Sequence, residues 1–154
     1  KHTFFSKNER LMKLVATGHF DNIPSYDDPT SSPGMAYSMH TEALEFTKFM
    51  LQLLNQTGLS ANTYANMLSE RSLLTYEEGE QKPKYKEHMG ESLAVRDSPF
   101  GLVFGHGGNN GDFRCVFEVY KDLRMGYVVY TNSSTAYPFL EKMKLFFVEG
   151  RQEP

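Results

Sequence analysis

Residues 104–113 combine a histidine, closely spaced glycines and two asparagines in one run. The run reads Phe-Gly-His-Gly-Gly-Asn-Asn-Gly-Asp-Phe, with the histidine at position 106. Glycines let a substrate backbone approach closely because they have no side chain, and a histidine can exchange a proton near neutral pH. We interpret this run as one wall of an active site. The alternative is a plain hairpin, in which the glycines supply positive φ angles and His106 is a hydrogen-bonded structural residue.

The sequence argues against phosphate, metal and nucleic-acid sites. The glycines follow the pattern G-x-G-x-x-x-G ahead of a predicted strand, whereas phosphate-binding loops carry G-x-x-x-x-G-K-[ST] or G-x-G-x-x-G ahead of a helix. The five histidines never stand four residues apart, and Cys115 is the single cysteine, so no Cys/His quartet exists. The net charge is −3, and no cluster of Lys and Arg stands out. We therefore expect no metal, no cofactor and no nucleic-acid partner.

Four segments between about residues 91 and 131 have the composition of β-strands. They are Glu91–Arg96, Gly101–His106, Phe113–Tyr120 and Met125–Thr131. The third alternates apolar and other side chains, which predicts one buried face that includes a packed Cys115 and a second face that carries Glu118 and Tyr120. The connections are hairpin-sized, and Asn-Gly at 110–111 is a strong hairpin signal, so we expect antiparallel pairing.

Three helices are predicted around this sheet, at about residues 39–55, 63–73 and 135–148. Ser38 is the expected N-cap of the first helix, and Glu42 favours its positive end. In the last helix, one apolar stripe can lie on the sheet, and it consists of Ala136, Leu140, Met143 and Phe147.

The predicted fold class is therefore α+β, in a single domain over residues 1–154. Residues 18–34 and 75–86 are predicted to be loops, because they are rich in Asp, Pro and Ser or in Glu, Lys and Gln. No apolar run approaches the roughly 20 residues that span a bilayer, and the first residues lack the pattern of a signal peptide. We expect no membrane span.

The order of motifs along the chain resembles the C-terminal half of a known superfamily. A helix opens with Ser38-Met-His-Thr-Glu42, the run at 104–113 follows after a long gap, and Gly126-Tyr-Val-Val-Tyr-Thr-Asn132 precedes the final helix. The opening Lys1–Ser6 and the segment Pro33–Ser38 are similar to phrases of the same proteins. This order resembles the serine β-lactamase-like superfamily of penicillin-binding proteins, which includes class C β-lactamases, D-alanyl-D-alanine carboxypeptidases and esterases. The resemblance covers nearly the whole chain and implies a partial β-lactamase/transpeptidase-like fold.

The resemblance implies roles for individual residues of the run. His106-x-Gly108 is similar to the third box of the family, K-T-G or H-x-G, which lines one edge of the active site. His106 would then help to position the acyl group or to polarise the proton network. The backbone N–H of Asn109 would be one donor of the oxyanion hole. Gly107, Gly108 and Asn110 would contact the substrate.

The sequence departs from the family at the nucleophile. The family's first box is S-x-x-K, and no serine of this chain has a lysine three residues later. The letters of the second box, Y-x-N, occur at Tyr64-Ala65-Asn66, but they follow the helix at 39–55, whereas the family places them before it. We interpret this match as a coincidence. Both missing boxes would lie upstream of Lys1.

We therefore expect a C-terminal fragment of a larger serine hydrolase, inactive by itself. The parent would form an acyl-enzyme with a β-lactam, a D-Ala peptide or a small ester. Histidine in place of lysine weakens the β-lactamase option, because a permanent cation holds a substrate carboxylate better, and favours a peptidase or esterase. By resemblance alone, the parent would be bacterial and exported, for example to the periplasm. The alternatives are a non-catalytic ligand-binding module on the same fold and a chain that self-associates through an uncovered sheet surface.

Overall fold

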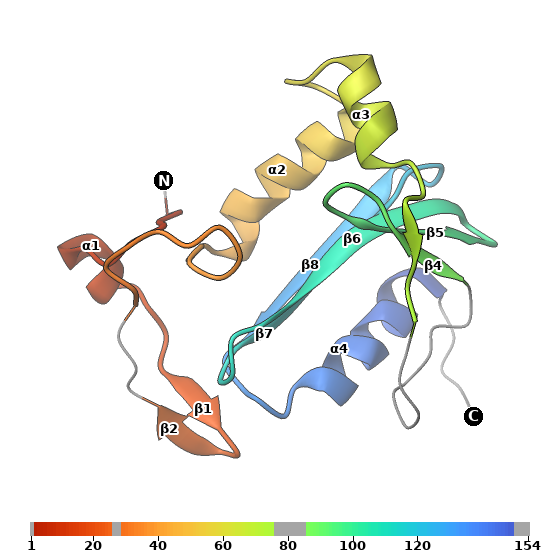
Figure 1. Ribbon diagram of the computed structural model, residues 1–154. Helices are drawn as coiled ribbons and strands as arrows, with labels where there is room; N and C mark the ends of the chain where they lie inside the picture. The colour runs from red at the N-terminus through yellow and green to blue at the C-terminus, as the bar shows by residue number, and fades with distance from the viewer. Residues whose placement is uncertain (1, 26–28, 76–85, 150–154) are drawn as a thin grey trace. The chain divides into compact units, whose positions relative to one another are not determined.

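The computed structural model of the chain describes residues 2–25, 29–75 and 86–149. It confirms an α+β fold built from helices and antiparallel sheets (Figure 1). The chain forms two compact units. The first contains Lys1–Thr47, Gly107–Val116 and Val128–Pro154, and the second contains Lys48–His106 and Phe117–Tyr127.

The larger sheet has six strands in the order β3-β4-β5-β6-β7-β8. Their bounds are β3 Ser72–Leu73, β4 Glu87–Met89, β5 Ala94–Ser98, β6 Gly101–Asn109, β7 Arg114–Tyr120 and β8 Met125–Thr131. The four predicted strands correspond to β5 to β8, so the prediction of about four strands missed two short ones at one edge. β6 also extends three residues beyond its predicted end at His106.

The predicted helix at 63–73 is wrong in its second half. Helix α3 covers only Ala61–Met67, and residues 72–73 form β3 instead. The Ser69 hydroxyl donates to the Asn66 carbonyl at 2.8 Å, which satisfies one carbonyl at the end of the helix. The Arg71 N–H then donates to the Met89 carbonyl at 2.9 Å, so pairing with β4 overrides helix propensity here. The predicted loop at 75–86 falls almost wholly on residues 76–85, outside the described residues.

Helix α2 (Ala43–Asn55) begins four residues later than the predicted helix, and Ser38 does not cap it. The Glu42 carboxylate accepts the N–H groups of Leu44 and Glu45 at 2.8 and 2.9 Å, so Glu42 is the capping residue. Ser38 is instead buried in the preceding turn. Its hydroxyl donates to the Gly34 carbonyl at 2.7 Å and accepts the Gly34 N–H at 2.8 Å.

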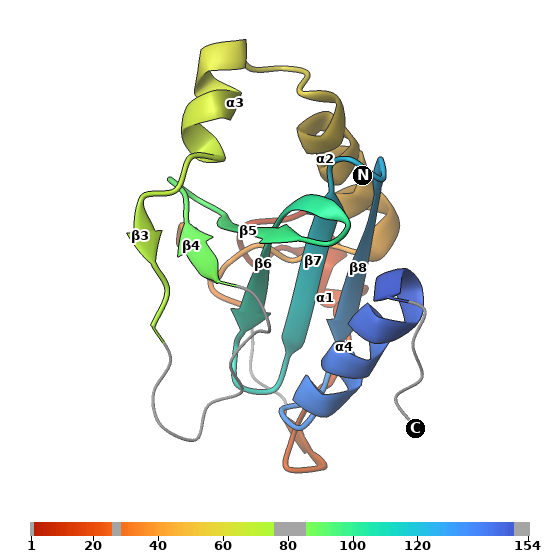
Figure 2. The same ribbon diagram turned by 90° about the vertical axis from the view of Figure 1, so that its right-hand side faces the viewer.

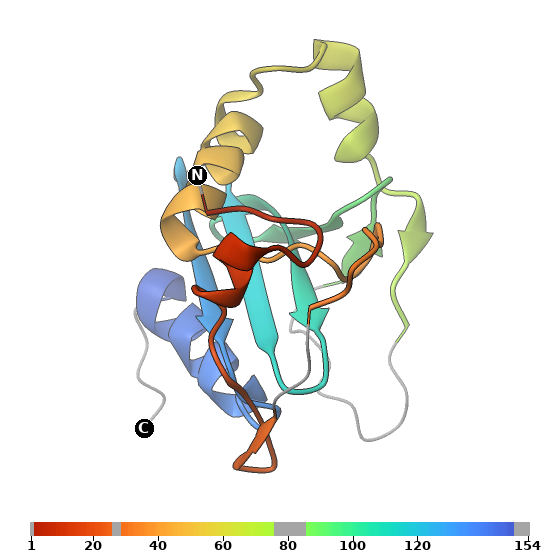
Figure 3. The ribbon, with the colours of Figure 1, turned by 90° about the vertical axis from the view of Figure 1, so that its left-hand side faces the viewer.

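Part of the segment predicted as a loop at 18–34 forms a small hairpin. Strands β1 (Gly18–Phe20) and β2 (Ile23–Ser25) pair antiparallel and make a separate two-stranded sheet (Figure 3). The two residues between them, Asp21 and Asn22, have φ values of 48° and 66°. Such a pair of left-handed residues matches a type I′ turn, which Asp and Asn tolerate better than other non-glycine residues. In the preceding helix, α1 (Glu9–Met12), Asn8 is the N-cap, and its side-chain oxygen accepts the Leu11 N–H at 3.0 Å.

The C-terminal helix is confirmed, and it packs against the sheet beside β8 (Figure 2). Helix α4 covers Tyr137–Lys144 and continues as a π-helix over Leu145–Glu149. Of the predicted stripe, Ala136 and Leu140 are buried, Met143 is half-buried and Phe147 is exposed. The wider π-helical turn changes the spacing after Lys144, so the stripe does not continue to Phe147.

Candidate functional site

The residues singled out in the sequence lie at the far end of β6 and in the turn that follows. His106 is the last β6 residue of the second unit, and Gly107–Asn109 continue the strand in the first. The side chains of His106 and Asn109 are exposed, as is Asn110 in the turn, and Gly108 is half-buried. These residues therefore line a solvent-facing stretch of backbone rather than a buried pocket.

The predicted Asn-Gly hairpin turn is confirmed. Gly111 has a φ of 75°, and its N–H donates to the Asn109 side-chain oxygen at 3.0 Å. The Asn110 N–H donates to the Phe113 carbonyl at 3.1 Å, on the side of β7. The Arg114 guanidinium donates to the carbonyls of Gly111 and Phe113 at 2.6 and 3.0 Å. These bonds hold the turn in one shape, so the strand end before it is also held.

The Asn110 side chain ties this turn to the loop before α2. Its amide nitrogen donates to the Tyr37 carbonyl at 3.0 Å. The Tyr37 ring lies against Gly34, where an added Cβ would come within 2.5 Å of the ring. The bonds of the Ser38 hydroxyl to Gly34 close the same loop, so Asn110 and Ser38 together fix the loop backbone. The Tyr37 side chain stays more than half exposed. The sequence did not predict this tether, because it joins segments 73 residues apart.

The backbone N–H of Asn109, the implied oxyanion donor, points away from β7. Successive N–H groups of a strand point to opposite edges, and the Asn110 N–H bonds on the β7 side. Strand β5 pairs with β6 from Gly101 to Gly105. The Asn109 N–H thus lies past this paired stretch, on the edge of β6 to which an extended substrate could hydrogen-bond.

Cys115 on β7 lies directly beside Gly108 on β6. A Cβ added to Gly108 would come within 2.5 Å of the Cys115 sulfur, whereas one added to Gly107 would meet nothing closer than 3.8 Å. Burial raises the pKa of the Cys115 thiol, which favours the neutral form. The thiol is therefore a packing group that only a residue without a side chain can face.

We predict that Gly108→Ala destabilises the chain by about 1–3 kcal/mol, the range for overpacking a core. Gly107→Ala is the matched control, and it should be neutral or slightly stabilising, because alanine loses less entropy in a strand. Urea unfolding followed by circular dichroism measures both. Adding Cys115→Ala to Gly108→Ala should restore most of the loss. An equal loss in the double variant would show that the sulfur is not the obstacle.

Tyr64, the first residue of the Y-x-N letters, belongs to the buried core of the second unit. Its ring is buried, and its hydroxyl donates to the Thr57 carbonyl at 2.5 Å.

Over the residues that the structure describes, no group of three or more His, Cys, Asp or Glu side chains is placed to hold a metal ion. Within the same residues, no helix has the length and apolar character required to span a membrane.

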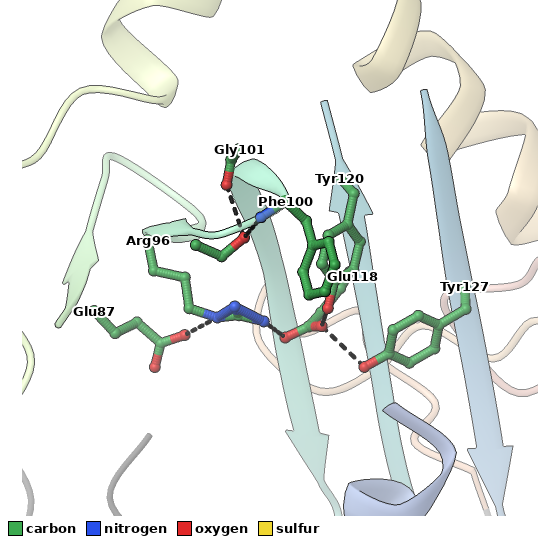
Figure 4. Close-up of polar contacts among 8 residues, drawn as sticks. Glu87, Arg96, Phe100, Gly101, Glu118, Tyr120 and Tyr127 are labelled. Carbon is green, nitrogen blue, oxygen red and sulfur yellow. Dashed lines mark hydrogen bonds and ion pairs between the residues drawn. The ribbon is translucent and has the colours of Figure 1, made fainter. Parts of the chain in front are cut away.

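The sequence missed a buried polar cluster in the second unit, which consists of Arg96, Glu118, Tyr120 and Tyr127 (Figure 4). One Glu118 oxygen accepts from the Arg96 guanidinium at 2.6 Å. The other accepts from the hydroxyls of Tyr120 and Tyr127 at 2.8 and 3.0 Å. Glu87 adds a longer ion pair to Arg96 at 3.8 Å.

This buried polar cluster corrects the prediction that β7 buries only one face. Phe117 and Val119 are buried as predicted, but Glu118 and Tyr120 on the opposite face are buried too. Their polar atoms bond to one another and to Arg96, which removes the penalty that usually keeps a carboxylate in water. A signal was present in the sequence, since Arg96 and Glu118 each stand next to apolar strand residues.

The electrostatics of the cluster favour its ionised pair. Burial lowers the pKa of Arg96, but the Glu118 carboxylate, helped by Glu87 and the hydrogen bond, raises it by more. Burial raises the pKa of Tyr127, and the adjacent Glu118 carboxylate raises it further, so its phenol stays protonated and donates. Every Glu118 oxygen already has a partner, which makes the cluster a structural element rather than a second catalytic site.

Neither the models of known protein families nor the curated proteins contain a match to this chain.

Proposed function

We propose that this chain is the C-terminal part of a β-lactamase-like serine hydrolase that works through an acyl-enzyme. One observation carries the proposal. His106 and Gly107 are exposed and Gly108 is half-buried near the end of β6, and the next N–H, that of Asn109, points to the strand edge away from β7. Sequence order supports it too, because the helix, the third box, the final strand and the last helix follow one another as in the family.

The proposed roles are those that the resemblance to the family implies. A serine outside these 154 residues would attack the substrate carbonyl, and the Asn109 N–H would donate to the oxygen as it gains negative charge. Gly107 and Gly108 present bare backbone, so a substrate chain can lie close to the edge of β6. His106, whose side chain is exposed, would position the acyl group or polarise the proton network.

Within this class, we favour a D-Ala peptide or a small ester over a β-lactam. The third box carries an imidazole in place of an ammonium group, and an imidazole is not a permanent cation for a substrate carboxylate. The non-catalytic module remains the second candidate function, since the absence of an S-x-x-K pattern favours it directly. The sequence upstream of Lys1 distinguishes the two, because only the enzyme requires S-x-x-K followed by Y-x-N there.

Two substrates and one probe test the proposal. The 154-residue chain should show no turnover of nitrocefin or p-nitrophenyl acetate above buffer, because no activated serine is present. The same chain extended by the preceding gene sequence should hydrolyse the ester and bind a fluorophosphonate at one serine. A covalent serine adduct on the 154-residue chain itself would contradict the fragment interpretation. An extended chain without turnover or adduct would leave the binding module as the better account.

A further inference from the structure

The buried polar cluster joins three strands of the sheet without using any side chain of the strand between them. Arg96 comes from β5, Glu118 and Tyr120 from β7, and Tyr127 from β8, all within the second unit (Figure 4). Strand β6 lies between β5 and β7. The Arg96–Glu118 bond therefore crosses β6, and its geometry depends on how β6 is aligned with both neighbours.

Cross-strand partners define the alignment of β6 with β5 on one side and β7 on the other. Arg96 faces Val103 on β6. The Lys121 N–H donates to the Leu102 carbonyl at 2.9 Å, which sets Val103 opposite Tyr120 and Gly105 opposite Glu118. A Cβ on Gly105 would come within 2.1 Å of the Phe117 carbonyl oxygen, in agreement with this close pairing. The cluster thus lies over two adjacent cross-strand rows.

Apart from the turn at residues 110–113 and the close approaches at Gly105 and Gly108, strand β6 has little of its own to specify this alignment. Four of its nine residues are glycine, and it buries successive residues on both faces from Val103 to Gly105. A strand that is glycine-rich and apolar on both faces tolerates slippage, because a shifted register still buries apolar groups. A displacement by two residues moves a strand by roughly 6–7 Å and returns the same face to the same side.

Net stability does not explain why an ion pair is buried here. Arg96 is 4% exposed and Glu118 is 8% exposed, so both charges have lost most of their water. The attraction between buried charges often does no more than offset that loss, and apolar residues of similar size are frequently as stable. The cluster instead supplies a directional constraint, because the Arg96–Glu118 bond crosses β6 and forms in one alignment only.

We propose that the buried polar cluster is a register lock. It fixes the β5–β6 hairpin against the β7–β8 hairpin, so that the glycine-rich β6 takes a single alignment. A shift of two residues between β6 and β7 would separate Arg96 from Glu118 and leave both charges buried without each other. This inference concerns the fold of the second unit and does not depend on the proposed hydrolase function.

The test compares the register of the natural chain with that of an apolar variant. Glu118→Leu alone removes the acceptor that Arg96 and two hydroxyls share, so the deciding variant changes all four residues. It carries Arg96→Met, Glu118→Leu, Tyr120→Phe and Tyr127→Phe. Nuclear Overhauser effects between α-protons report the register, because Gly105 and Glu118 form a pair with close α-protons in the observed alignment.

The natural chain should give one set of β6 resonances, with α-proton contacts from Gly105 to residue 118 and from Val103 to residue 120. The four-fold variant should fold but give at least two sets for β6, including contacts from Gly105 to residue 116 or 120. The matched control is Arg71→Met with Glu91→Leu, which removes a half-exposed pair of the same residue types at 3.0 Å. It should keep one set.

Two results would overturn the proposal. A four-fold variant with one set of β6 resonances in the natural register would show that the cluster is not needed to fix it. A four-fold variant that fails to fold would show that the polar groups supply the stability of the sheet rather than its alignment.

Discussion

Glu118→Leu is expected to destabilise the chain by about 3–5 kcal/mol, the usual cost of removing one partner of a buried ion pair. Among the described residues, the Arg96 guanidinium would keep the Glu87 carboxylate, 3.8 Å away, as its ion-pair partner, and the hydroxyls of Tyr120 and Tyr127 would lose their Glu118 acceptor. Domains of this size are stable by about 5–15 kcal/mol, so the loss removes a large share of the total. Urea unfolding followed by circular dichroism measures it.

The control for this prediction is Glu91→Leu, which breaks the ion pair with Arg71. Both of these side chains are half exposed, so water replaces the lost partner and the change should stay within about 1 kcal/mol. Glu118→Gln gives a third comparison, because an amide keeps the shape and one acceptor oxygen. A Glu118→Leu variant as stable as the control would mean that Arg96 reaches solvent or another carboxylate.

The second large effect tests the proposed hydrolase function, in a chain extended by the preceding gene sequence. Asn109→Pro removes the backbone N–H that we propose for the oxyanion hole, and we expect kcat/KM for p-nitrophenyl acetate to fall by about 10²–10³-fold. The ladder with β7 should survive, because the hydrogen bond on that side belongs to the neighbouring Asn110 N–H. Steady-state hydrolysis, with circular dichroism as a check on folding, measures the change.

Asn109→Ala is the matched comparison for this substitution. Both variants lose the side-chain oxygen that accepts the Gly111 N–H, so this loss cancels between them. Only the proline variant lacks the backbone donor. A proline variant as active as the alanine variant would rule out the Asn109 N–H as an oxyanion donor and would point to another group of the parent.

The elements with strong local signals could be predicted from the sequence. The alternation in β7, the Asn-Gly turn at 110–111 and the helical spacing after Glu42 each depend on residues close together in the chain. The predicted β5 to β8 order therefore agrees with the sheet. The end of the helix at Met67 could not be predicted, because it depends on the pairing of Arg71 with Met89 in β4.

In the candidate site too, only the features with a local sequence signal could be predicted. His106 and its glycines could be found by residue type, and the turn beyond them by its Asn-Gly pair. The tether from Asn110 to Tyr37 and the burial of Glu118 could not, since each depends on a partner distant in sequence. A carboxylate at an alternating strand position normally faces water, and only the guanidinium from another strand reverses that expectation.

The pairing of Arg96 with Glu118 also constrains how the protein can evolve. A substitution that neutralises one of the two positions first leaves the other charge buried, and such an intermediate is poorly stable. Replacing both together has no comparable barrier. The two positions are therefore epistatic: sequences that descend from this one should keep both charges or lose both, and the tyrosines at 120 and 127 should become free to change only after the carboxylate has gone.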